Sequence, residues 1–308
     1  MLAGGAAAAL AGPLRPAEAD PLVVETESGK LRGTVADGLR LFKGIPYGQA
    51  ERFRPPGPAA RWTGIREALH YGPPCPQING DAGAWKDPAT AGEDCLVLNV
   101  WAPQGARGAP VMVWIHGGAF ETGSGGLAIY DGGTLARTGQ VVVVTLNHRL
   151  NLFGYWHLAT LADRFAGASN LGQLDLVRAL AWIKANIAGF GGDPGNVTLF
   201  GESGGGGKIS VLMAMPAAQG LFHKAIIESG AMPRCRTRDE AAATAQYMMR
   251  ALEATTVPQL LDMPPERLLK AYEAVLPSQA SLDFDQLLFA PYVDGTILPA
   301  QPEESLAL

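Results

Sequence analysis

Apolar residues in the central part of the chain fall into short runs, which glycine-rich or polar segments separate. Residues 96–103, 109–115 and 140–147 form three such runs, and their length and β-branched content are typical of buried strands. Two later runs, residues 196–200 and 225–229, have the same character. We therefore predict a strand at each of these positions.

Helical periodicity lies between and after these runs. Apolar residues recur every three or four positions across residues 171–187, which predicts a helix with one apolar stripe. A second helix ends before Pro216, and residues 237–277 are helical again, with Pro258 and Pro265 in first turns. Strands that alternate with helices predict an α/β fold with a doubly wound, mostly parallel sheet, which binds ligands at the carboxyl ends of its strands.

Two segments before the first central strand have a different pattern. Residues 21–63 carry hairpin signals, and we expect short strands there. Residues 72–92 are rich in proline and glycine, and we expect them to form a surface loop.

The first residues of the chain are rich in alanine and differ in composition from all that follows. Ala17-Glu18-Ala19 has the small-x-small form of a signal-peptidase site, although a positively charged segment is missing before it. We expect residues 1–19 to be an export signal and Asp20 to begin the mature protein, with a disordered tail as the alternative. Residues 20–308 then form one domain.

Composition excludes several classes of function. Of 308 residues, 47% are hydrophobic and 17% are charged, as in globular proteins, and 24 basic against 29 acidic residues give a net charge of −5. Without a basic run we expect no nucleic-acid partner, and no apolar run reaches the roughly 18 residues of a membrane span. Cys75, Cys95 and Cys235 lack metal-ligand spacing, so we expect neither a metal nor another cofactor.

The segment Gly201-Glu202-Ser203-Gly204-Gly205 lies between a predicted strand and a predicted helix. A G-x-S-x-G sequence in this setting is a nucleophile elbow, in which a strained turn projects the serine hydroxyl above the sheet. Side chains two positions before and after the serine would collide there, which accounts for Gly201 and Gly205. An ordinary glycine-rich loop is the alternative, and the flanking strand and helix argue against it.

The elbow requires an oxyanion hole, for which backbone amides are the usual donors. Gly204 supplies the amide after the nucleophile, and Gly117 and Gly118 supply two more from a loop directly after the predicted strand 109–115. An ordinary glycine turn is the alternative for this loop. Gly206 and Gly207 are not required by the elbow, so they serve either close helix packing or room for an acyl group.

Six segments of the chain resemble the type-B carboxylesterase family of α/β-hydrolases, which includes bacterial p-nitrobenzyl-type esterases and cholinesterases. In order, they are "GIPYGQAERFRPP", "EDCLVLNVWAP", "VWIHGGAF", "NIAGFGGDPGNVTLFGES", "GLFHKAIIESG" and "FAPYVDGTILP". The family usually has alanine where this chain has Gly204, a change that keeps the amide donor. The resemblance places Glu202 and Ser229 beside the catalytic residues.

The resemblance also implies specific pairings between side chains. It favours a disulfide bond between Cys75 and Cys95 and leaves Cys235 unpaired. It further implies two buried ion pairs, which are Arg52–Glu93 and Arg149–Asp175.

A serine esterase also needs a histidine base and an acid that orients it, and in this fold both follow the serine in the chain. His70, His116, His148 and His157 precede Ser203, and His223 follows it too closely. The chain resembles the N-terminal portion of a longer enzyme with the α/β-hydrolase fold, and we expect the C-terminal strands of that sheet to be missing from it. We therefore expect the acid and the histidine of the triad not to be present in it, and little activity from this chain alone.

These observations favour a serine carboxylic-ester hydrolase that acts on small-molecule esters through an acyl-enzyme. One alternative is a non-catalytic, cholinesterase-like binding or adhesion module, because the same fold serves that role in some relatives. Another is a nonfunctional fragment. The presence of both the serine and the glycine loop argues for the hydrolase.

Overall fold

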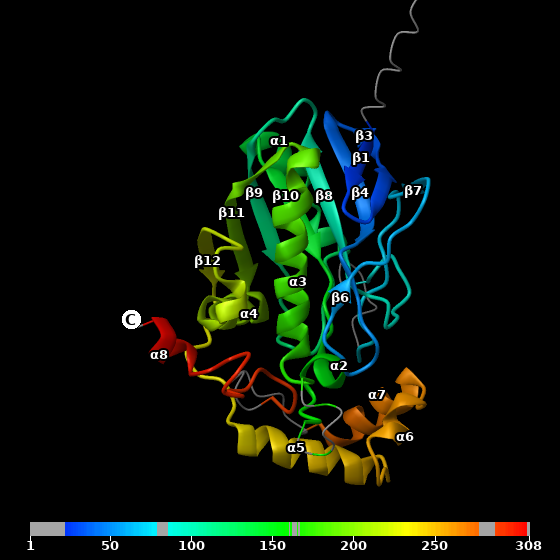
Figure 1. Ribbon diagram of the computed structural model, residues 1–308, viewed down its shortest axis with the longest axis vertical. Helices are drawn as coiled ribbons and strands as arrows, with labels where there is room; N and C mark the ends of the chain where they lie inside the picture. Colours follow the sequence, from blue (N-terminus) through cyan, green and yellow to red (C-terminus); the bar gives the residue numbers. More distant parts are fainter. Residues whose placement is uncertain are drawn as a thin grey trace, which may run out of the picture.

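The computed structural model describes residues 22–78, 86–159, 161, 165, 167–276 and 287–306. The expected export signal, residues 1–19, and the expected mature start at Asp20 lie outside the described residues. Figure 1 shows an α/β architecture in which one large sheet crosses the molecule and helices pack around it.

The central sheet has seven strands in the spatial order β12-β11-β9-β10-β8-β4-β3. Strands β12, β11, β9 and β10 pair in parallel, whereas β8, β4 and β3 are added by antiparallel pairing. All strands predicted in the central region are therefore present, and β8 differs from the others in its direction. The strands span Thr34–Ala36 (β3), Leu39–Pro46 (β4), Val97–Pro103 (β8), Ala109–Ile115 (β9), Val142–Leu146 (β10), Gly192–Glu202 (β11) and Lys224–Glu228 (β12).

Side chains on the two faces of the sheet enter two apolar clusters. On one face, Trp101 and Val143 pack with Ala136 of α1 (Gly133–Gly139). The main core lies on the other face, with side chains from α3 (Leu171–Asn186) and α4 (Gly204–Ala214). Because both faces are covered, β8 and β10 are buried along their whole length. The doubly wound arrangement and the two central helices are confirmed.

Smaller elements complete the fold. Hairpin strands occur in the N-terminal region as predicted, and most of the remaining helices lie near the carboxyl ends of the parallel strands (Figure 1). Pro258 and Pro265 occupy first-turn positions as predicted. These elements are β1 (Val23–Thr26), β2 (Gly29–Arg32), β5 (Gly48–Gln49), β6 (Gly57–Pro58), β7 (Ile65–Glu67), α2 (Asn151–Tyr155), α5 (Arg238–Ala251), α6 (Pro258–Leu261), α7 (Pro265–Val275), α8 (Pro302–Leu306) and the 3₁₀ turns η2 (Ala128–Tyr130), η4 (Ile187–Phe190) and η5 (Pro216–Ala218).

Both ion pairs implied by the resemblance are present, but only Arg149–Asp175 is buried as expected, whereas Arg52–Glu93 is half-buried. Arg149 binds Asp175 on α3 through two hydrogen bonds, Nε to Oδ2 at 2.9 Å and Nη2 to Oδ1 at 2.7 Å. Arg52 binds Glu93 in the same two-pronged manner. Because Arg149 and Asp175 are buried, their mutual hydrogen bonds offset the cost of removing both charges from water. This pair fixes α3 to the loop that follows β10.

The cysteines differ from the expected pairing. Cys75, Cys95 and Cys235 are all buried free thiols, so the Cys75–Cys95 disulfide bond is not formed in this structure. The Cys75 and Cys95 side chains nevertheless form a hydrogen bond with each other. This hydrogen bond, together with burial, raises the pKa of the Cys95 thiol. The disulfide bond therefore stays a prediction.

We expect thiol titration of the denatured, unreduced protein from an oxidising compartment to find one free thiol per chain. Only Cys75 and Cys95 lie together, which leaves Cys235 unpaired. Titration after reduction is the control and should find three. Three free thiols before reduction would contradict the disulfide bond.

Candidate active site

Two loops of the predicted site lie side by side because their strands are neighbours. β11 pairs in parallel with β9, and Gly201 lies opposite Ile115. The segments that leave these strands therefore emerge together at the carboxyl edge of the sheet. One of them is the turn at Ser203, which leads into α4, and the other contains Gly117 and Gly118.

The backbone of Ser203 has a conformation that non-glycine residues rarely adopt, with φ of +53° and ψ of −120°. Hydrogen bonds hold it on both sides. The Ser203 amide donates to the Glu228 carbonyl on β12 at 2.9 Å, and its carbonyl accepts from the Gly207 amide at 3.1 Å. The serine therefore stands on a strained strand-to-helix turn, directly before the positive end of the α4 dipole.

Glycines let the start of α4 approach its neighbours at backbone distance. A Cβ atom on Gly201 or Gly205 would lie 2.6 or 2.1 Å from the carbonyl oxygen of Ile115. A Cβ atom on Gly204 would lie 2.3 Å from the Ala119 carbonyl oxygen. All three distances are far below van der Waals contact, and the obstructing atoms belong to the backbone. In this chain the loop is therefore too close to α4 for alanine at Gly204.

Gly206 serves close packing too. A Cβ atom there would lie 2.5 Å from the carbonyl oxygen of Ser229, at the end of β12. Of the two roles considered for this glycine, packing is therefore the one that the geometry favours.

The glycine loop after β9 lies directly against the serine. A Cβ atom on Gly117 would lie 3.7 Å from the Ser203 Cβ atom. Two residues further along the loop, the backbone of Ala119 packs against Gly204. The structure thus brings Gly117, Gly118 and Gly204 together around Ser203. Among the described hydrogen bonds, none uses the amide of Gly118 as a donor.

Further contacts hold this loop in place. The Glu121 and Thr122 amides donate to the Gly118 carbonyl at 3.2 and 3.0 Å, and the Asn151 amide of α2 donates to the Phe120 carbonyl at 2.7 Å. The Tyr272 hydroxyl of α7 donates to the Glu121 carboxylate. Elements that are distant in the sequence therefore fix the loop from outside the sheet.

Glu202 and Ser229 also lie beside the serine. The Glu202 carboxylate would be 3.4 Å from a Cβ atom on Gly117. Ser229 has a left-handed backbone with φ of +63°, and a Cβ atom on the next residue, Gly230, would lie 2.0 Å from the Ser203 carbonyl oxygen. No hydrogen bond of the Ser229 hydroxyl is present in the described part of the chain.

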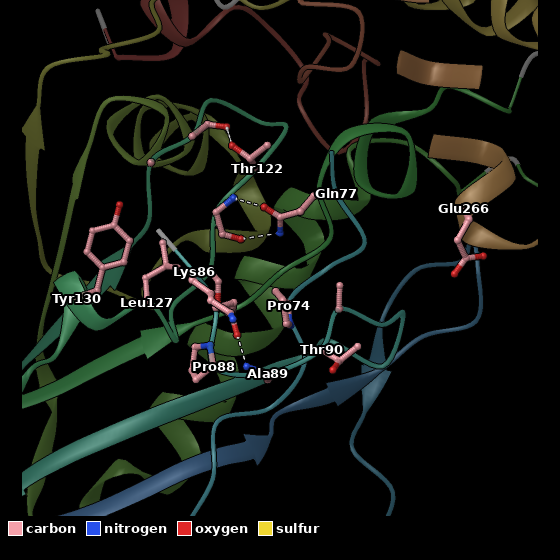
Figure 2. A pocket seen from close by; sticks show the side chains of 16 residues that line it. Pro74, Gln77, Lys86, Pro88, Ala89, Thr90, Thr122, Leu127, Tyr130 and Glu266 are labelled. Carbon is pink, nitrogen blue, oxygen red and sulfur yellow. Dashed lines mark hydrogen bonds between the residues drawn. The ribbon is translucent and has the colours of Figure 1, made fainter. Parts of the chain in front are cut away.

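A cleft of about 660 Å³ opens in front of the glycine loop. Figure 2 shows Leu127 and Tyr130 on one side of this cleft and Glu266, from α7, on the far side. Gln77 stabilises one wall of the cleft through two hydrogen bonds to Gly123. Its Oε1 atom accepts from the Gly123 amide at 2.7 Å, and its Nε2 atom donates to the Gly123 carbonyl at 3.0 Å. The cleft is large enough for a small ester.

Tyr130 is a site residue that sequence reasoning missed. Burial and the Glu202 carboxylate raise the pKa of its hydroxyl, while a hydrogen bond from the Gly117 amide to this hydroxyl lowers it. The hydroxyl therefore lies near the predicted oxyanion donors. No motif in the sequence singles out this tyrosine, because it approaches the serine only through the fold.

None of the five histidines hydrogen-bonds to the Ser203 hydroxyl in the described structure. His116 and His148 are buried and stacked, with ring centroids 4.8 Å apart. His157 binds the Tyr292 hydroxyl. His223 accepts a hydrogen bond from the Val197 amide in the middle of β11, and it lies directly before β12, whose other end bonds the Ser203 amide. His70 is exposed and lies outside the cleft. The structure therefore shows no histidine in the position of a catalytic base.

Sequence reasoning also missed Lys208, a completely buried lysine on α4. Its ammonium group donates to the His116 carbonyl at 2.9 Å. Burial lowers the pKa of Lys208 to about 7. Burial and the nearby Lys208 lower the pKa of His116 to about 3, so this imidazole is neutral at physiological pH.

The described residues contain no group of three or more His, Cys, Asp or Glu residues that could hold a metal ion. No helix among them is both long enough and apolar enough to cross a membrane.

Known proteins resemble this chain over most of its length. A family model described as the carboxylesterase family matches residues 20–308. The para-nitrobenzyl esterase of Bacillus subtilis (strain 168) is 43% identical over 293 residues, which are 92% of this chain and 59% of that protein. The phenmedipham hydrolase of Pseudarthrobacter oxydans is 39% identical over 297 residues, which are 92% of this chain and 58% of that protein.

Solved structures agree with these relatives. A thermophilic p-nitrobenzyl (PNB) esterase superposes with a TM-score of 0.86 and 43% identity, covering 94% of this chain and 60% of that one. The chain thus spans less than two thirds of the length of the relatives that it matches.

We expect Gly205→Ala to lower the free energy of unfolding by at least about 2 kcal/mol, because the new methyl group meets the Ile115 carbonyl at 2.1 Å. The matched control is Gly57→Ala, where the nearest atom is 3.9 Å away and the change should stay within about 0.5 kcal/mol. Denaturant unfolding measures both. Equal stability of the two variants would show that the elbow is not tightly packed.

Lys208 gives a pH-dependent stability. Above pH 7 the folded chain has released a proton that the unfolded lysine keeps until about pH 10, so the unfolded state binds more protons. The free energy of unfolding should therefore rise with pH from 7 to 10, by up to about 1.4 kcal/mol per unit, relative to Lys208→Met. Denaturant unfolding of both proteins at several pH values measures this difference. A difference that is constant across this range would contradict the prediction.

Proposed function

The chain belongs to the carboxylesterase family, and on that premise we propose that it carries the nucleophile and oxyanion hole of a serine carboxylic-ester hydrolase. The observation that carries the proposal is the strained Ser203, which stands beside Gly117, Gly118 and Gly204. The resemblance read from the sequence is confirmed at the level of the family.

In this proposal the Ser203 hydroxyl attacks the ester carbonyl carbon, and the carbonyl oxygen becomes an oxyanion. The amides of Gly117, Gly118 and Gly204 bind this oxygen, and the positive end of α4 stabilises its charge. Collapse of the intermediate releases the alcohol and leaves an acyl group on Ser203. Water then attacks the acyl-enzyme and releases the carboxylic acid. The reaction needs no cofactor.

A base must take the proton of Ser203, and the described histidines do not reach it. His116 binds the Gly117 carbonyl through Nδ1 at 2.9 Å, and His223 lies directly before β12, at the end of that strand away from Ser203. We therefore propose that this chain alone turns over esters at least about 1000-fold more slowly than an enzyme with a complete triad. Glu202 and Ser229 support the serine in this scheme without replacing the base.

Two proposals on the location and form of the protein rest on the sequence alone. Residues 1–19 direct export, and residues 20–308 form the mature domain. A Cys75–Cys95 disulfide bond would suit an oxidising compartment.

The test is incubation of the purified chain with a fluorophosphonate, followed by mass spectrometry of tryptic peptides. We expect a slowly formed adduct on Ser203 that Ser203→Ala lacks, and the same adduct in the control Ser305→Ala. Hydrolysis of a short-chain p-nitrophenyl ester, measured beside it, should be very slow.

Two results would change this account. An absence of any adduct on Ser203 would favour a non-catalytic binding module. Turnover of several esters per second that Ser203→Ala abolishes would show that a base is present after all.

A further inference from the structure

The elbow mechanism uses no residue of α4 beyond Gly204, yet α4 buries a lysine close to the site. The Lys208 side chain is fully buried, and its described hydrogen bond goes to the His116 carbonyl oxygen at 2.9 Å. Its ammonium group also lies 5.6 Å from the centroid of the Phe120 ring. An apolar side chain would fill this position without the cost of burying a charge.

The surroundings of Lys208 are neutral. None of the described ion pairs includes it. Its charge helps to lower the pKa of His116 and of His148, and burial lowers both further. Each of these two imidazoles binds a backbone carbonyl through Nδ1, and the Nε2 atom of each has no described partner. The ammonium group therefore binds a peptide carbonyl and not a carboxylate.

The carbonyl that Lys208 binds belongs to the same peptide group as the Gly117 amide. A peptide group is planar, and in the trans form its C=O and N–H bonds point in opposite directions. No cis peptide bond is present among the described residues. A hydrogen bond that fixes the His116 oxygen on the α4 side therefore directs the Gly117 N–H away from Lys208. On that other side the Gly117 amide meets the Tyr130 hydroxyl, and the α-carbon of Gly117 lies beside Ser203.

We propose that Lys208 is a positioning residue for the oxyanion-hole loop: it binds the His116 carbonyl and thereby orients and polarises the His116–Gly117 peptide group toward the Tyr130 hydroxyl, beside Ser203. The inference rests on the proposed function of Gly117. A positive charge on the carbonyl side strengthens the N–H as a donor, because linked hydrogen bonds polarise one another. The effect should weaken when Lys208 loses its proton.

Lys208 is the group of this cluster that titrates near neutrality. Burial lowers its pKa to about 7, and no charged group on β9, β11, β12, α3 or α8, the elements packed against α4, contributes to the shift among the described residues. His116 faces it from the loop after β9, and His148 faces it from the loop after β10. The pKa of each of these histidines is lowered, so both remain neutral between pH 6 and 8.

The sequence offers a selective probe of this peptide group. His116–Gly117 is the only histidine that glycine follows, so protein with ¹³C-carbonyl histidine and ¹⁵N-glycine gives one signal in a carbonyl-correlated amide NMR spectrum. We expect this signal to shift with pH with a midpoint near 7. The shift should be absent in Lys208→Met. It should persist in Lys184→Met, whose ammonium group grips the Gly220 carbonyl at 3.1 Å in an exposed setting.

Lys208→Gln provides a second variant with a neutral donor, and decides the matter if Lys208→Met does not fold. In Lys208→Gln the His116–Gly117 amide signal should lie near the position that it has in the wild type at high pH. It should not shift with pH. A wild-type signal that does not titrate, or one that titrates equally in Lys208→Gln, would overturn the proposal.

Reactivity of Ser203 separates this proposal from the proposed function. The rate of fluorophosphonate labelling should be about 10-fold or more higher in the wild type than in Lys208→Met below pH 7, and the ratio should fall above pH 7. A ratio that is independent of pH would indicate a purely structural role and overturn the proposal. If Ser203 is not labelled in any protein, the proposed function fails, while the NMR titration still decides whether Lys208 grips the peptide group.

Discussion

The close approach of two backbone segments organises this protein. The first turn of α4 and the loop after β9 lie so near one another that a Cβ atom on Gly204 or Gly205 would overlap carbonyl oxygens of the loop or strand. Backbone at this distance leaves amide groups and not side chains around Ser203. The strained serine, the glycine loop and the start of the helix therefore depend on one another, and none of them could form its part of the site alone.

Positive charge lies on the α4 side of the glycine loop. The dipole of α4 and the buried Lys208 ammonium both present positive charge on the helix side, while the buried imidazoles of His116 and His148 stay neutral. Electrostatic stabilisation of an oxyanion needs donors that are fixed before the reaction begins. We infer that the buried Lys208 is retained, although its burial is unfavourable, because its hydrogen bond to the His116 carbonyl orients the Gly117 amide on the opposite side of the same peptide group.

Local patterns in the sequence predicted the elements that depend on local causes. Apolar runs located β8 to β12, and the glycines around Ser203 followed from the steric needs of the turn. The antiparallel direction of β8 was not predicted, because strand pairing depends on the path of the chain and not on the strand itself. Tyr130 and Lys208 were missed for a related reason, since each reaches the site only through tertiary packing. A lysine in a helical pattern usually marks a solvated face, and here it is buried.

The most direct measurement is a crystal structure of the protein with a phosphonyl group on Ser203. The account predicts that the phosphonyl oxygen lies about 2.7–3.1 Å from the amide nitrogens of Gly117, Gly118 and Gly204, with Lys208 still bound to the His116 carbonyl. A phosphonyl oxygen that points into solvent, or a Gly117 amide that is turned away from it, would contradict the account.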